Sequence, residues 1–201
     1  DAGKPEKGKD ASGKETDIEL SQDGSTCLLV FKTNSDQYGK FSFFKVVSGK
    51  IESDTVLLNT RTGTNEKISH IYMMQGKKNT EVKTINCGDI GAVSKLNETK
   101  TSDTLCDPKK PVTAEAIKFD QPTYSMAISP KTKGQEDKIA AGLSRLSEED
   151  HTFTCENNVE THQMVLSGAG DIHLDVLCSK LKNKFGVEVE LSPARVAYRE
   201  K

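Results

Sequence analysis

The sequence predicts two domains, an antiparallel β-barrel followed by an α+β sandwich with the β-α-β-β-α-β order of the ferredoxin-like fold. The barrel is predicted by short apolar stretches between residues 26 and 110, which turn residues separate and which show no helical period. The sandwich is predicted by strand-like and helix-like segments that alternate between residues 122 and 192. A chain of 201 residues and 22.0 kDa is long enough for two small domains.

Residues 1–25 predict a flexible linker, because they hold no aromatic residue and only Ile18 and Leu20 as large aliphatic residues. Gly8 and Gly13, followed by Lys14, nearly complete the G-x-x-x-x-G-K-[ST] pattern of a phosphate-binding loop. Glu15 stands where that loop needs a hydroxyl to hold magnesium, and no apolar strand precedes the pattern. We therefore expect no nucleotide site in this segment.

Within residues 26–110, barrel strands are predicted where apolar residues cluster, at 27–32, 41–43, 44–47 and 54–59. Turns are predicted at the glycines between these segments, among them Gly39, Gly49 and Gly63. A closed antiparallel barrel is the arrangement that leaves no strand edge exposed.

Residues 111–121 are expected to form a second linker, because Pro108 and Pro111 stand where the pattern of short strands ends. The sandwich then follows as strand 124–128, helix 135–147, strands 153–155 and 163–166, a helix from Asp171 and strand 187–191. The second helix has one apolar face, formed by Leu174, Leu177, Cys178, Leu181 and Phe185, and Gly186 is placed to end it.

The composition excludes several classes of protein. The 28 basic and 30 acidic residues nearly cancel, so a net charge of −2 argues against binding driven by overall positive charge. No apolar run approaches the length of a membrane span, and the first 14 residues hold no apolar stretch typical of a signal peptide. The five cysteines form no C-x-x-C pair, which favours free thiols in a reducing compartment, the cytoplasm.

Side chains that could carry chemistry are few. Cys155, His162, His173 and Cys178 lack the short spacing of metal ligands, so packed thiols are the favoured interpretation and no metal site or catalytic residue is expected. An enzyme that uses a Cys–His pair stays open as an alternative. Gly168-Ala169-Gly170 lacks the third glycine of a dinucleotide fingerprint, so a tight turn before a helix is expected.

Several stretches, taken together, resemble translation elongation factor G. In its third domain the resemblance lies in residues 124–133 (YSMAISPKTK), 143–150 (LSRLSEED) and 168–176 (GAGDIHLDV), the last similar to the family pattern G-x-G-E-L-H-L-E. In its second domain it lies in residues 31–33, 39–49, 87–90 and 103–105, and residues 196–200 resemble the entry into the fourth domain. The stretches follow one another in the family's order over residues 26–200.

The resemblance implies the second and third domains of a ribosomal translocase: a barrel of the translation-factor domain II type that docks on small-subunit RNA, and a sandwich next to the switch loops of the GTPase domain. It implies that residues 193–201 are a hinge toward a missing fourth domain, that GTP and magnesium bind elsewhere in the parent protein, and that no cofactor binds here. It also implies partners in the small-subunit rRNA and protein and in the GTPase domain of the same chain, a monomer, and no membrane.

Carried over residue by residue, the resemblance implies that His173, Leu174 and Lys180 face the switch loops and the pocket for fusidic acid. Basic residues that would face the ribosome are Lys131, Lys133, Arg195 and Arg199. In a protein that binds no nucleic acid, the same basic residues would form an ordinary solvated surface.

This sequence departs from the family pattern at six positions: Ser102, His151, Ala169, Asp171, Ser192 and Ala194. The departures leave open a paralogue that acts in ribosome recycling or disassembly, and a ribosomal protection or release-factor GTPase shares both folds. A stand-alone RNA-binding module is the alternative from another class.

Overall fold

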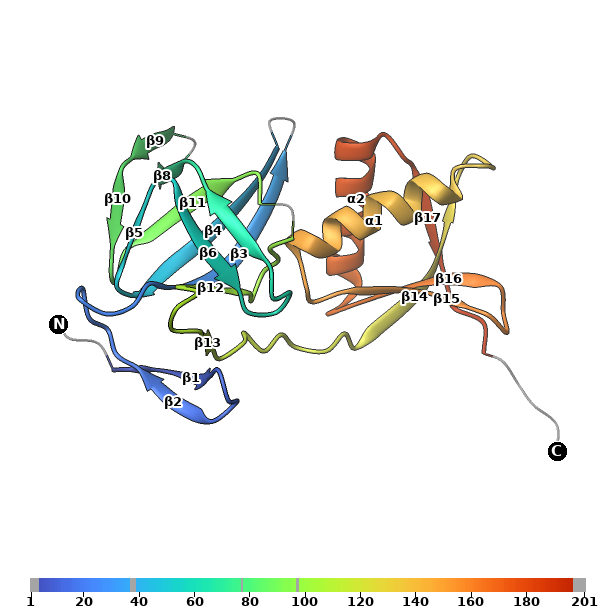
Figure 1. The fold of residues 1–201 in the computed structure, drawn as a ribbon. Helices are drawn as coiled ribbons and strands as arrows, with labels where there is room; N and C mark the ends of the chain where they lie inside the picture. Colours follow the sequence, from blue (N-terminus) through green and yellow to red (C-terminus); the bar gives the residue numbers. More distant parts are fainter. Residues whose placement is uncertain (1–3, 37–38, 77, 97, 197–201) are drawn as a thin grey trace. The chain divides into compact units, whose positions relative to one another are not determined.

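The computed structural model describes residues 4–36, 39–76, 78–96 and 98–196, and the chain forms two compact units, Asp1–Ile117 and Lys118–Lys201 (Figure 1). Arg199, one of the predicted ribosome-facing residues, lies outside the described residues. Each unit has its own hydrophobic core.

The first unit is built on an eight-stranded antiparallel sheet with the order β7-β6-β12-β3-β4-β11-β8-β9. The strands are β3 (Cys27–Asp36), β4 (Gly39–Ser48), β6 (Thr55–Asn59), β7 (Asn65–Ile68), β8 (Ile71–Gln75), β9 (Lys78–Val82), β11 (Ile90–Ser94) and β12 (Thr104–Cys106). Leu28, Val30, Phe44 and Val46 alternate along β3 and β4 and are fully buried on the inner face. The sheet curls around this core, which confirms the predicted barrel.

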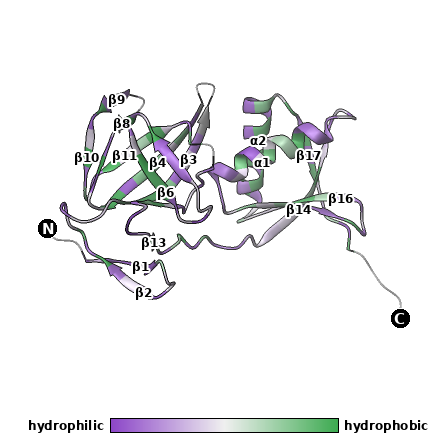
Figure 2. Ribbon diagram, viewed as in Figure 1, coloured by the Kyte–Doolittle hydropathy of each residue, from purple (hydrophilic) through white to green (hydrophobic). Residues whose placement is uncertain are grey.

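A separate antiparallel pair, β5 (Lys50–Glu52) and β10 (Thr84–Asn86), completes the wall of the barrel. Its central residues, Ile51 and Ile85, lie directly opposite each other and are buried in the same core. Figure 2 shows apolar residues on the strands that enclose this core.

The N-terminal segment corrects the prediction of a flexible linker over residues 1–25. β1 (Glu6–Asp10) and β2 (Glu15–Ile18) form a hairpin, and β1 also pairs with β13 (Val112–Ala114), which falls in the second predicted linker. We call β1, β2 and β13 the N-terminal sheet. The hairpin is ordered by contacts that local composition does not reveal: Ile18 is buried against Cys27, Val47 and Ala114.

The second unit contains a four-stranded antiparallel sheet of order β15-β16-β14-β17 and the helices α1 (Glu136–Glu149) and α2 (Asp171–Phe185). The strands are β14 (Tyr124–Pro130), β15 (Thr154–Asn158), β16 (Gln163–Gly168) and β17 (Val189–Ser192). Figure 1 shows both helices on one face of the sheet. This order confirms the predicted ferredoxin-like sandwich.

The core of the second unit lies between the helices and the sheet. Its buried residues include Ile139, Leu143 and Leu146 of α1 and Leu174, Leu177 and Leu181 of α2. As predicted, α2 ends at Gly186, whose φ of 66° is the left-handed conformation that glycine adopts without steric cost. Neither α1 nor α2 has the length and apolar composition needed to cross a membrane, within the residues that the structure describes.

Candidate functional site

The turn between β16 and α2 is held by a histidine from the helix it precedes. The backbone N–H of Ala169 donates to Nδ1 of His173 at 3.1 Å. Because Nδ1 accepts this hydrogen bond, the neutral ring must carry its proton on Nε2. His173 thus closes the Gly168-Ala169-Gly170 turn, the tight turn that the small residues predicted.

The other side of the His173 ring contacts the end of α1. Its Nε2 lies 3.0 Å from Oδ2 of Asp150, the residue at the C-terminal cap of α1. Oδ1 of Asp150 accepts hydrogen bonds from the backbone N–H and the hydroxyl of Thr152, at 2.9 and 2.6 Å. Burial alone would raise the pKa of Asp150, but the hydrogen bonds from Thr152 and His173 outweigh it, and the pKa is lowered.

The solvent-facing side of α2 carries two apolar residues one turn apart, Ile172 and Val176, which are 74% and 45% exposed. Lys180 follows them four residues later and is partly exposed. A helix of a folded unit usually turns such residues inward. We call this side, with Ile172, Val176 and Lys180, the α2 outer face.

The three residues predicted to face the switch loops separate in the structure. Lys180 lies on the α2 outer face and His173 at its edge, with a side chain that is 18% exposed. Leu174 is fully buried against Gly168 in the core of the second unit, so its side chain does not reach a surface of this unit. Ile172 and Val176 are the exposed residues that sequence reasoning missed, although both stand outside the predicted apolar face.

The predicted ribosome-facing residues of the second unit that the structure describes follow two strands of its sheet. Lys131 and Lys133 follow β14 and are exposed, and Nζ of Lys131 lies 3.9 Å from Glu188. Arg195 follows β17 and is exposed, while its backbone N–H donates to Gln163 Oε1 at 2.9 Å. The backbone of Arg195 is therefore held near the start of β16, which lies beside the end of β14 in the sheet, where the two lysines follow.

The outer face of the barrel carries an aromatic group that the sequence reasoning also missed. Ser42 and Phe44 of β4 are fully buried in the barrel. Successive side chains of a strand point to opposite faces, so Phe41 and Phe43 point outward. Phe41 packs edge-on against Tyr72 of β8, with ring centroids 6.1 Å apart. Nζ of Lys32 lies 5.8 Å from the centroid of the Phe43 ring. We call Lys32, Phe41, Phe43 and Tyr72 the barrel outer face.

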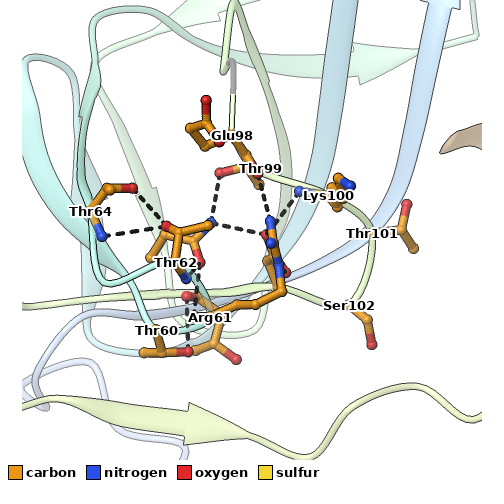
Figure 3. A network of polar contacts seen from close by, with 12 residues as sticks. Thr60, Arg61, Thr62, Thr64, Glu98, Thr99, Lys100, Thr101 and Ser102 are labelled. Atoms are coloured by element: carbon orange, nitrogen blue, oxygen red, sulfur yellow. Dashed lines mark hydrogen bonds and ion pairs between the residues drawn. The ribbon is translucent and has the colours of Figure 1, made fainter. Parts of the chain in front are cut away.

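A buried carboxylate fixes the loop before β12 against the turn after β6. Asp103, 4% exposed, accepts two hydrogen bonds from Arg61, at 2.6 and 2.9 Å, and one from Asn59 at 2.9 Å. Arg61 also donates to the carbonyl of Glu98 (Figure 3). The hydroxyl of Thr99 donates to Glu66. Burial opposes ionisation of Asp103, but the bonds from Arg61, Lys100 and Asn59 lower its pKa.

The loop that Asp103 anchors contains a backbone conformation unusual for its residue. Ser102 has a φ of 77°, in the left-handed region that glycine favours. The Ser102 hydroxyl accepts a hydrogen bond from the backbone N–H of Ile117 at 2.7 Å. The serine at this position, one of the departures from the family pattern, thus ties the end of the first unit to this loop.

The side chains of both networks are held by contacts within the chain. His173 and Asp150 are locked by backbone partners, and Arg61 and Asp103 neutralise each other. Among the described residues, no three His, Cys, Asp or Glu side chains converge where a metal ion could bind. Among the described residues, the α2 outer face and the barrel outer face carry apolar or aromatic side chains outside the two cores.

Two family descriptions match the chain in the order of its two units. The family described as Elongation factor G domain 2 matches residues 25–108, and that described as Elongation Factor G, domain III matches residues 119–193. The chain belongs to the elongation factor G family.

A solved structure supports the same assignment. The chain is similar to the crystal structure of ttk003000868 from Thermus thermophilus, with 26% sequence identity and a TM-score of 0.77. The similarity covers 86% of this chain and 26% of the Thermus chain. The chain thus spans about a quarter of the length of that relative.

Proposed function

We propose that this chain is the ribosome-contacting centre of an elongation factor G-like GTPase that moves transfer and messenger RNA along the ribosome in the cytoplasm. The observation that carries the proposal is the order of the two family matches, domain 2 at residues 25–108 and domain III at 119–193, each on the corresponding fold. GTP and magnesium bind in the GTPase domain of the parent protein, and the parent acts as a monomer.

The first unit contacts the RNA of the small subunit. The barrel outer face supports this role, because Phe41, Phe43 and Tyr72 offer aromatic edges and faces to bases or sugars while Lys32 can meet a phosphate. Affinity then comes from a local surface, which agrees with a net charge of only −2 for the whole chain. Exposed basic residues of the second unit, Lys131, Lys133 and Arg195, add further contacts to the ribosome.

The second unit relays the nucleotide state to the domains that follow it. The α2 outer face supports this role, because Ile172 and Val176 are apolar and exposed and a GTPase domain in the same chain would cover them. The contact from His173 to Asp150 fixes α2 against α1, so a force applied to α2 moves the sandwich as a rigid body. The pivot is expected in the segment after β17.

The experiment that tests the proposal measures two kinds of binding with this chain. Purified small ribosomal subunits are titrated with the fluorescently labelled chain, and binding that weakens with salt is expected. Labelled GTP is titrated in parallel, and micromolar binding of GTP would contradict the assignment of the nucleotide site to the parent's GTPase domain. Equal affinity for an unrelated RNA of matched length would favour the stand-alone RNA-binding module instead.

A further inference from the structure

Two cysteines lie directly opposite each other on neighbouring strands beneath the N-terminal sheet. Cys106 of β12 pairs with Cys27 of β3 in the antiparallel ladder, and both thiols are free and fully buried. Their neighbours Leu28 and Leu105 point into the barrel core, so both cysteine side chains point outward from it. Opposite residues of an antiparallel ladder share one face, so the two thiols face the same space.

The hydrogen bonds of the ladder show which type of pair Cys27 and Cys106 form, and the type of pair sets the distance between their Cα atoms. The N–H of Asp107 donates to the carbonyl of Thr26, and the N–H of Val30 donates to the carbonyl of Asp103. Hydrogen-bonded pairs recur at every second position of an antiparallel ladder, so Cys27 and Cys106 form a non-hydrogen-bonded pair. Such pairs have Cα atoms about 4.5 Å apart, within the range of about 4.4 to 6.8 Å that a disulfide spans.

The N-terminal sheet covers this pair of thiols. Cys27 packs in one apolar cluster with Ile18 of β2 and Ala114 of β13. The N–H of Ala114 also donates to the hydroxyl of Thr104 at 3.0 Å, two residues before Cys106 in β12. Burial raises the pKa of Cys27 to about 12 and raises that of Cys106 as well. Because the thiolate is the form that attacks a disulfide, the pair is protected while the sheet is closed.

We propose that Cys27 and Cys106 are a dithiol site that forms an intramolecular disulfide when the N-terminal sheet opens in the presence of a small disulfide such as oxidised glutathione. One thiolate attacks the small disulfide and releases one glutathione thiol; the second protein thiolate then attacks the mixed disulfide and releases the other. The two cysteines lose two electrons and two protons, and the glutathione disulfide is reduced to two thiols. The new bond joins β12, which leads into β13 and the second unit, to β3.

The test uses a variant in which Cys87, Cys155 and Cys178 are all replaced by serine, so that only the proposed pair remains. The folded variant is incubated with oxidised glutathione, free thiols are alkylated, and tryptic peptides are analysed by mass spectrometry. The expected product is a peptide that contains Cys27 linked to a peptide that contains Cys106, lighter by two hydrogen atoms than the separate thiols. Recovery of both cysteines as alkylated thiols or as separate glutathione adducts would overturn the proposal.

The unmodified chain provides a second measurement that does not depend on the folding of the variant. Oxidation is expected to yield the Cys27–Cys106 crosslink, and a crosslink of either residue to another cysteine instead would contradict the pairing.

A further pair of variants tests whether the N-terminal sheet controls access. A side chain at Gly8 would lie 2.6 Å from the carbonyl oxygen of Thr113 and 2.7 Å from Ile18 Cδ1, so Gly8→Val forces β1 away from β13 or β2. Gly8→Val is expected to speed crosslinking on the order of tenfold. Gly13→Asn is the matched control, because a Cβ atom added at Gly13 would have no heavy atom within 4 Å and asparagine tolerates its φ of 82°. Equal rates in the two variants would show that the N-terminal sheet does not protect the pair.

Discussion

His173 donates from Nε2 to the carboxylate of Asp150 over 3.0 Å and accepts from the backbone of Ala169 with Nδ1, so one ring joins the end of α1 to the turn before α2. The ring accepts one hydrogen bond and donates the other, and of its two neutral tautomers only the one protonated on Nε2 can do both. The histidine of the family-like motif at residues 168–176 therefore has a defined mechanical role in this chain.

Replacing His173 with alanine is expected to lower the free energy of unfolding of the second unit by about 1 to 3 kcal/mol. The variant leaves the N–H of Ala169 without its acceptor and Asp150 without one of its donors. Urea unfolding followed by circular dichroism measures the change. The control is His162→Asn, because His162 is exposed and asparagine suits its φ of 51°. An equal loss of stability in the two variants would contradict the role of His173.

The network around Asp103 predicts how stability depends on pH. Its pKa is lowered in the folded chain, so the stability it contributes is fully present above the ordinary value of 3.8 and is lost as pH falls through the lower folded pKa. Asp103→Asn removes the charge that Arg61 and Asn59 bind, and we expect a loss of about 2 to 4 kcal/mol at neutral pH.

Thermal unfolding of wild type and Asp103→Asn between about pH 7 and pH 2.5 checks this prediction. The difference in unfolding temperature between wild type and Asp103→Asn is expected to become smaller in acid, because protonation of Asp103 removes the same charge from the wild-type chain. If the difference in unfolding temperature stays constant down to the lowest pH, the loss of stability comes from the amide side chain itself and not from the missing charge of the carboxylate.

Ser102 predicts a difference between two small substitutions. Both Ser102→Gly and Ser102→Ala lose the hydrogen bond from the N–H of Ile117, but only glycine adopts a φ of 77° without steric cost. Ser102→Gly is therefore expected to be more stable than Ser102→Ala by about 1 kcal/mol in denaturant titrations. Two variants of equal stability would mean that serine and alanine carry no strain at this position.

The contact between the helices predicts an effect of side-chain volume at Gly142. A Cβ atom there would lie 2.7 Å from Leu181 Cδ2 and 3.3 Å from a ring atom of Phe185. Gly142→Val is expected to destabilise the second unit by about 1 to 3 kcal/mol, because α1 must move away from α2. Ala141→Val, on the exposed side of the same helix, controls for helix propensity and should cost only about 0.5 kcal/mol.

The barrel outer face predicts which substitutions weaken binding to the small ribosomal subunit. Lys32→Gln should reduce the salt dependence of binding by about one counterion, and Phe43→Ala should weaken binding at all salt concentrations by about 1 to 3 kcal/mol. Lys50→Gln is the matched control, because Lys50 is exposed and lies in the separate pair of β5 and β10. If Lys50→Gln and Lys32→Gln have equal effects, a different surface binds the RNA.

The sequence patterns predicted both folds because each core repeats a clear period. Leu28 and Val30 alternate in a strand, and Leu174, Leu177 and Leu181 follow a helix, so local residues alone indicate the buried side. Those patterns could not predict the N-terminal hairpin, whose strands EKGKD and ETDI are mostly polar. Its first strand, β1, pairs with β13, about a hundred residues away in the sequence.

The surface residues were predicted less well for a related reason. The sequence predicts Leu174 on the apolar face of α2, and the family resemblance implies that it faces a binding surface. In the structure Leu174 is completely buried, as the apolar face requires. The resemblance to a motif identifies a helix and its position, but not which residues remain exposed after the helix packs. Ile172, Val176 and the outward rings of Phe41 and Phe43 become visible only when the register of the strands and the rotation of the helix are known.

The pairing of β1 with β13 determines the shortest piece of this chain that can be expected to fold as a barrel unit. The family match for the barrel begins at residue 25, but an excision there would remove β1 and β2 and leave the edge of β13 with unpaired backbone groups. It would also uncover the apolar side chains of Val47 and Cys27. A shortened protein that begins before Glu6 should therefore stay monodisperse at concentrations where one that begins at Thr26 aggregates.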